Sequence, residues 1–245
     1  MSRLLAWDLP VRLIHWLLAI SFGGALIVAT TSDDGSRIFP LHAIFGLMAV
    51  FLVVLRIVWG LIGSRPARFS AFDLRPSSLG RYARSVVNGQ TESSRGHNPA
   101  TAWFAIALFA VLLATGASGL ANARGIEAAE EVHEVLPWIA AALVAMHLAG
   151  LALHTIRHRE NVAVGMISGR ANVHPDSAIR SAHAAAAIGL VLLVTIAGAA
   201  LFTAWNPAAR SIDLPFGAPL QIGENESAET GHGGDEQQEE RDDHD

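Results

Sequence analysis

An apolar stretch at residues 131–154, EVHEVLPWIAAALVAMHLAGLALH, contains three histidines at regular intervals. His147 follows His133 by fourteen residues, and His154 follows His147 by seven. Fourteen residues of helix rise by about 21 Å and return the side chain to within about 40° of its first direction, so the three imidazoles share one face. An ionisable side chain in a membrane helix is generally functional. Neutral imidazole is a natural axial ligand for haem iron, which makes these residues candidates for holding a cofactor.

Two more apolar segments carry a histidine at a matching depth. His42 opens the second apolar segment and would lie level with His133, whereas His15 is near the start of the first segment and would lie level with His147. Each level then holds one histidine from each of two helices. This arrangement is what two bis-histidine b-type haems need, one above the other in a four-helix bundle. We therefore predict His42 with His133, and His15 with His147, as the axial ligands of two haem irons.

Arg56 and His154 lie on the same helix faces as these histidines. Arg56 follows His42 by fourteen residues. A lone arginine within a span needs an anionic partner, such as a haem propionate, unless its head reaches the membrane surface. His154 is an alternative to His147 as iron ligand; otherwise it would contact a propionate or a quinone, or lie at the interface. Glycines in these segments would give a macrocycle clearance or serve ordinary helix packing; they are Gly23, Gly24, Gly46, Gly116, Gly119 and Gly150.

Five apolar runs are long enough to position these residues across a membrane, which takes about 20 residues of helix. They cover residues 12–31, 41–62, 99–120, 132–156 and 179–203, and the fifth is an alanine-rich run of modest hydrophobicity. Short connections make successive helices antiparallel, so we predict an all-α membrane protein with an up-down four-helix transmembrane bundle and a fifth transmembrane helix. The predicted parts are 1–171 for the bundle, 172–205 for the additional helix and 206–245 for a disordered acidic tail.

Composition narrows the chemistry and gives the orientation. The chain is 51% hydrophobic and has no cysteine, which excludes disulfides, thiolate-held iron–sulfur clusters and thioether-attached haem. All 17 basic residues are arginines, and twelve of them flank the spans on the side of the N-terminus, against four on the other side. The N-terminus is therefore predicted to be cytoplasmic, in a multi-pass membrane protein. The net charge of −5 comes from the last 22 residues, which hold ten acidic residues and one arginine.

Several ordered motifs resemble one family. They are WDLPVRLIHW at the start of the chain, LHAIFG and RIVWGLIGSRPARFSAF around the second span, GHNP before the third, and LPWIAAALVAMHLAGLALH with RENVAVGMISGR at the fourth. Over residues 4–171 the chain resembles the bacterial cytochrome b-561 family, which includes the cytochrome b subunit of membrane nickel–iron hydrogenases. The resemblance implies a four-helix bundle with two b haems, and it places the haem ligands at His15, His42, His133 and His147.

The resemblance also implies electron transfer between a periplasmic donor, such as a c-type cytochrome or a hydrogenase, and the quinone pool. We expect an electron-transfer subunit rather than an independent enzyme, in contact with membrane lipid and with no role in nucleic-acid binding. A homo-oligomer is compatible with the sequence. Two alternatives stay open: a stand-alone quinone-linked oxidoreductase, for example one that oxidises superoxide, and a histidine-dependent metal or proton transporter. The histidines of the acidic tail favour the transporter, whereas the spread of the other histidines over two levels disfavours it.

Overall fold

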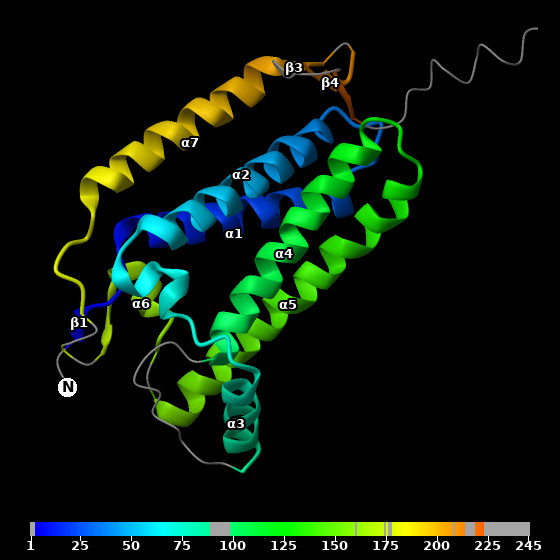
Figure 1. Cartoon of the computed structure of the whole chain (residues 1–245). Coiled ribbons are helices and arrows are strands. Elements are labelled where there is room, and N and C mark those ends of the chain that lie inside the picture. Colours follow the sequence, from blue (N-terminus) through cyan, green and yellow to red (C-terminus); the bar gives the residue numbers. More distant parts are fainter. Residues whose placement is uncertain are drawn as a thin grey trace, which may run out of the picture.

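Five long helices dominate the protein (Figure 1). The computed structural model describes residues 3–88, 99–159, 161–173, 175, 178–207, 209–213 and 219–222. The long helices are α1 (Leu9–Thr31), α2 (Pro40–Ile62), α4 (Pro99–Asn122), α5 (Ala128–His158) and α7 (Ala184–Ala204). All five are long and apolar enough to cross a membrane. The predicted all-α membrane fold is therefore confirmed.

The first three spans begin where the sequence supplies a proline or a capping residue. The carboxylate of Asp8 accepts a hydrogen bond from the backbone N–H of Val11 at 2.8 Å, and Pro10 lies in the first turn of α1. Pro40 and Pro99 are the first residues of α2 and α4. A proline fits the first turn because the N–H that it lacks would have no partner within the helix.

The fifth span begins later than the alanine-rich run predicts. The run starts at residue 179, but α7 begins at Ala184. The backbone before it bonds to the N-terminal segment instead. The N–H of Ile179 donates to the Leu5 carbonyl at 2.9 Å, and the N–H of Leu9 donates to the Ala182 carbonyl at 3.0 Å. These bonds hold the start of α7 against the start of α1.

The first four spans form two antiparallel hairpins, α1 with α2 and α4 with α5. The hairpins meet where α2 packs on α4. α7 packs on α1 and α2, on the side away from α4 and α5 (Figure 1). Within the described part of the chain, α5 packs most extensively on α4. It also reaches α2, where Ala140 shares a buried cluster with Val53 and the ring of His133 meets that of His42.

An apolar core lies midway along the bundle. Its buried members are Val53 of α2, Leu112 of α4 and Ala140 of α5. Ala140 is seven residues from His133 in one direction and seven from His147 in the other. Side chains of α1, α2 and α4 pack around these three; they include Leu18, Phe22, Ile57, Leu108 and Phe109. A closely packed apolar layer therefore separates the two histidine levels.

The end of the bundle that carries the N-terminus, here called the N-terminal end, has short elements. Strand β1 (Arg3–Leu5) pairs antiparallel with β2 (Arg170–Asn172), with Leu4 opposite Ala171. The connection from α2 to α4 contains the 3₁₀ turns η1 (Arg65–Ala67) and η2 (Phe69–Ala71) and helix α3 (Pro76–Val87), which the hydropathy pattern did not predict. Helix α6 (Val164–Ser168) precedes β2. The β1–β2 pair thus joins the first and the last segment of the four-helix domain's sequence.

The opposite end is covered by a three-stranded sheet that the sequence did not predict. Its strands are β3 (Trp205–Asn206), β4 (Ser211–Ile212) and β5 (Leu220–Gln221), in the order β3–β4–β5. Ile212, Leu220 and Ile222 are buried against α2, α4 and α7. The tail was predicted to be polar and disordered from residue 206, whereas its described residues 211–212 and 219–222 form strands or pack on the helices, because their apolar side chains have helix surface to cover. The acidic residues from 224 onward lie outside the described residues.

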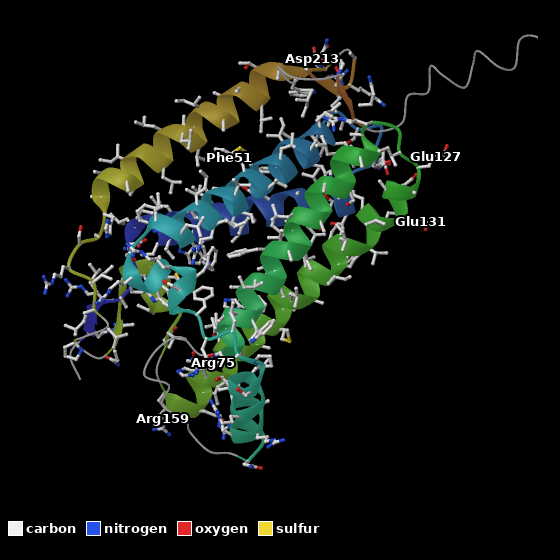
Figure 2. All side chains as sticks on the ribbon, viewed as in Figure 1. Phe51, Arg75, Glu127, Glu131, Arg159 and Asp213 are labelled. Atoms are coloured by element: carbon white, nitrogen blue, oxygen red, sulfur yellow. The ribbon has the colours of Figure 1, made fainter. Side chains whose placement is uncertain are left out.

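The outer surface of the spans suits lipid. Large apolar side chains of α7, such as Ile188, Ile196 and Phe202, are more than half exposed. Such continuous apolar exposure is expected where the surrounding solvent is hydrocarbon. Charged side chains lie at the two ends of the helices. Figure 2 shows Glu131 where α5 begins, at the opposite end, and Arg159 where α5 finishes, at the N-terminal end.

Candidate cofactor site

The structure brings His42 and His133 together between α2 and α5. Their ring centroids are 5.9 Å apart, and the ring planes are inclined at 81°. Two imidazoles that bind one metal ion, each through a bond of about 2 Å, have ring centroids roughly 6 Å apart. Both rings are half-buried. The spacing of this pair fits the ligation of a single iron.

The hydrogen bonds of these two rings leave the metal-binding nitrogen available. Nδ1 of His42 lies 2.9 Å from the Ala25 carbonyl oxygen, and Nδ1 of His133 lies 3.0 Å from the Thr115 carbonyl oxygen. A carbonyl oxygen only accepts, so each Nδ1 carries the hydrogen and each Nε2 keeps its lone pair. Histidines that ligate metals are usually oriented in this way by a carbonyl or a carboxylate.

The surroundings of the pair fix one ring by stacking and the other by close backbone approach. Phe39 stacks on His42 with centroids 5.5 Å apart and an interplanar angle of 21°. A Cβ at Gly119 would lie 2.6 Å from Cε1 of His133, so this position on α4 has room for hydrogen only. A Cβ at Gly46, one turn after His42, would have no atom within 4 Å. Gly46 therefore leaves space beside the pair that a flat macrocycle requires.

His15 of α1 and His147 of α5 are the second predicted pair, nearer the N-terminal end. Both rings are half-buried. Phe104 of α4 stacks on His147 with centroids 5.0 Å apart and an interplanar angle of 15°. Neutral imidazole is a natural axial ligand for haem iron, so both residues stay candidates for a second cofactor site.

Arg56 reaches into the same end of the bundle from α2. One terminal nitrogen, Nη2, donates to the Ala67 carbonyl at 3.2 Å. The guanidinium also lies 5.6 Å from the ring centroid of Phe69 and 5.9 Å from that of Phe109. The other nitrogen, Nη1, is buried and has no hydrogen-bond partner in the part of the chain that the structure describes. A buried cationic donor left open in this way fits an anionic group of a bound cofactor.

The remaining histidines are placed differently from these four. His154, the alternative to His147, is exposed near the end of α5. His183 precedes α7 and meets the ring of Trp59 edge-on at 5.7 Å. His97 and His174 lie outside the described residues. Among the described residues, no three or more histidine, aspartate or glutamate side chains are grouped so that they could hold a metal ion.

Helix α4 supports both histidines of α5, a role that the sequence reasoning missed. Phe104 stacks on His147, while the Thr115 carbonyl and the Ser118 hydroxyl face Nδ1 of His133. Ser118 follows Phe104 by fourteen residues, the same interval that separates the two histidines on the antiparallel helix α5. This matching interval on the third span was the available signal.

The glycines predicted to give clearance or to serve helix packing, apart from Gly119 against the His133 ring, divide into two groups. Gly116 packs directly on Val50, since a Cβ there would lie 2.1 Å from a Val50 methyl group, and Gly24 faces Phe45. These two serve close helix packing. Gly23 and Gly150, like Gly46, would accept a Cβ with no atom within 4 Å.

The fold and these residues define a class: a multi-pass helical membrane protein with histidines at two depths, in which one pair of imidazoles, His42 and His133, faces across two helices. The chain matches the profile of the prokaryotic cytochrome b561 family over residues 6–169 and belongs to that family. Membership implies a b-type haem and transmembrane electron transfer. No curated protein and no solved structure matches the chain.

Proposed function

We propose that the protein transfers electrons across the bacterial inner membrane, between a periplasmic redox protein and the quinone pool, with two bound haem b groups. The observation that carries this proposal is the position of the two histidines of α5. His133 faces His42, and His147 follows fourteen residues further along the same face of α5, at the level predicted for His15. Fourteen residues of helix separate the two levels by about 21 Å, most of the apolar thickness of a bilayer.

The chain's own residues explain how each pair would serve. Iron held by two imidazoles takes up and releases one electron, with a potential set by its ligands, burial and nearby charge. The Ala25 and Thr115 carbonyls hold His42 and His133 with Nε2 available. Such bonds also raise the basicity of a ligating imidazole. Bulk water is kept out between the levels by the apolar layer around Ala140.

Arg56 would anchor a propionate of the haem held by His15 and His147. Its buried Nη1 is the free donor, and the rings of Phe69 and Phe109 hold the guanidinium in place. A positive charge at this position also favours the reduced, more negatively charged state of a nearby redox group. Arg56 would thus both hold the cofactor and raise its potential.

The distribution of arginine supports a cytoplasmic N-terminus. Twelve of the 17 arginines belong to the segments at the N-terminal end, and those of the α2–α4 connection include the exposed Arg65, Arg75, Arg81 and Arg84. Arginine-rich connections remain on the cytoplasmic side of bacterial membranes. In this orientation the His42–His133 pair is the periplasmic one, and the His15–His147 pair is the cytoplasmic one. A c-type cytochrome or a hydrogenase would then exchange electrons with the periplasmic pair, as expected for an electron-transfer subunit.

The proposal is tested with purified protein in liposomes that contain trapped ferricyanide. A short-chain quinol is added outside, and the absorbance of the trapped ferricyanide is followed over time. We expect ferricyanide to be reduced by vesicles with the native protein, and far more slowly by vesicles with His133→Ala or His147→Ala. The His154→Ala variant is the matched control and should retain native rates. Native protein that binds both haems yet passes no electrons to the trapped acceptor would overturn the proposal.

A further inference from the structure

Two oxygen atoms of α4, not one, face Nδ1 of His133. The Thr115 carbonyl oxygen lies at 3.0 Å, and the Ser118 hydroxyl oxygen lies at 3.3 Å. Ser118 is 8% exposed, so water does not compete for its hydroxyl. The other ring of the pair differs, because Nδ1 of His42 meets the Ala25 carbonyl at 2.9 Å and, among the described residues, no hydroxyl. The two imidazoles that face each other are therefore held by unlike surroundings.

The direction of the Ser118 hydroxyl follows from its other bond. Its single hydrogen is donated to the Thr115 carbonyl at 2.9 Å. The hydroxyl therefore presents a lone pair, not a hydrogen, to His133. Since both neighbours of Nδ1 are then acceptors, the ring has one favourable neutral tautomer, with the hydrogen on Nδ1 and the lone pair on Nε2. The serine and the carbonyl together also resist rotation of the ring.

We propose that Ser118 is a positioning residue for the haem held by His42 and His133, and that it lowers the midpoint potential of that haem. The inference rests on the proposed function, because it assumes that His133 ligates iron. An additional acceptor at Nδ1 increases the electron density that the imidazole gives to the metal, which favours the oxidised iron. Ser118 acts on the iron only through the imidazole of His133, which its hydroxyl contacts.

The experiment is a redox titration of the purified protein, monitored in the visible spectrum, for the native chain and three variants. Ser118→Ala removes the hydroxyl, and Ser118→Thr keeps it. Thr203→Ala is the matched control, because the Thr203 hydroxyl bonds to the Ala199 carbonyl of its own helix at 2.9 Å without facing a histidine. The potential of the other haem, at His15 and His147, reports whether each variant keeps its fold.

We expect Ser118→Ala to raise one of the two midpoint potentials and to leave the other unchanged. The electron paramagnetic resonance signal of the same haem should change, because the ring loses one of its two restraints. Ser118→Thr should restore the native potential, and Thr203→Ala should titrate as the native protein does. Two native potentials in Ser118→Ala, a downward shift, or a shift of the other haem would overturn the inference. A native chain without a haem at His42 and His133 would instead refute the proposed function.

Discussion

Replacing Gly119 by alanine should remove or weaken one haem and spare the other. The added methyl carbon would lie 2.6 Å from Cε1, 2.9 Å from Nδ1 and 3.3 Å from Nε2 of His133. To restore an ordinary carbon–carbon contact, the ring has to retreat by about 0.8 Å. The retreat would lengthen the 3.0 Å contact between Nδ1 and the Thr115 carbonyl to about 3.8 Å, beyond hydrogen-bonding range.

The size of the effect follows from what the ring loses. A lost neutral hydrogen bond costs about 0.5–1.5 kcal/mol. Changes to the groups that orient a metal-binding histidine typically weaken metal affinity by about 10–100-fold. We therefore expect Gly119→Ala to purify with about one haem per chain under dilute conditions, or with a second haem that dissociates on gel filtration. The displaced ring also implies an altered potential for any haem that stays bound there.

The assay is haem content per chain by the pyridine haemochrome method, together with a redox titration. Gly198→Ala in α7 is the matched control, because it makes the same substitution in a membrane helix where a Cβ meets no atom within 4 Å. It should bind haem as the native chain does. If Gly119→Ala retained both haems with native potentials, His133 would not be positioned by this close approach, and the reasoning would be refuted.

Three further predictions concern other parts of the site. Alanine at either histidine of a pair should remove the same haem, measured by haem content; the variants are His42→Ala and His133→Ala for one haem, and His15→Ala and His147→Ala for the other. Arg56→Gln should lower one midpoint potential by roughly 70 mV. A positive charge about 10 Å from a haem iron, at a dielectric constant of about 20, changes the redox free energy by roughly 1.7 kcal/mol, which is roughly 70 mV for one electron. Arg65→Gln, at an exposed position, should leave both potentials unchanged. Asp8→Ala should lower the free energy of unfolding in detergent by about 2–4 kcal/mol, because it removes the cap of α1 and the hydrogen-bond acceptor of Trp59 and Ser64. Asp34→Ala, at an exposed position, should unfold as the native chain does.

The spans and the depth of each histidine could be predicted because both follow from helix geometry. A run of apolar residues fixes where a helix crosses the membrane, and a rise of about 1.5 Å per residue then fixes how deep His15 or His147 lies. Helices that cross the same membrane bring residues of equal depth to one level, whichever way each helix runs. Facing rings at His42 and His133 follow from the same reasoning, and the structure places them 5.9 Å apart.

The supporting residues could not be predicted because they depend on how α4 is rotated about its axis. Hydropathy does not specify that rotation, since this helix is apolar on every side. Thr115 and Ser118 therefore looked like ordinary small polar residues of a membrane helix. Gly119 was predicted to give a macrocycle clearance or to serve helix packing, and the structure places it against the His133 ring.

The sheet at the opposite end escaped prediction for a different reason. Its strands are two residues long, too short for an alternating pattern to be recognised. Ile212 and Leu220 become buried only because the ends of α2, α4 and α7 meet beside them. The strands at residues 211–212 and 220–221 are thus a consequence of tertiary packing rather than of local sequence.

The most direct test of two histidine pairs holding two haems is a reduced-minus-oxidised visible spectrum of the purified native protein, with haem counted per chain. Two b haems per chain, both with the bands of six-coordinate low-spin iron, are the predicted result, because each pair supplies two imidazoles to one iron. A colourless protein from haem-replete cells would contradict electron transfer by haem. A single haem would mean that one of the pairs does not bind iron.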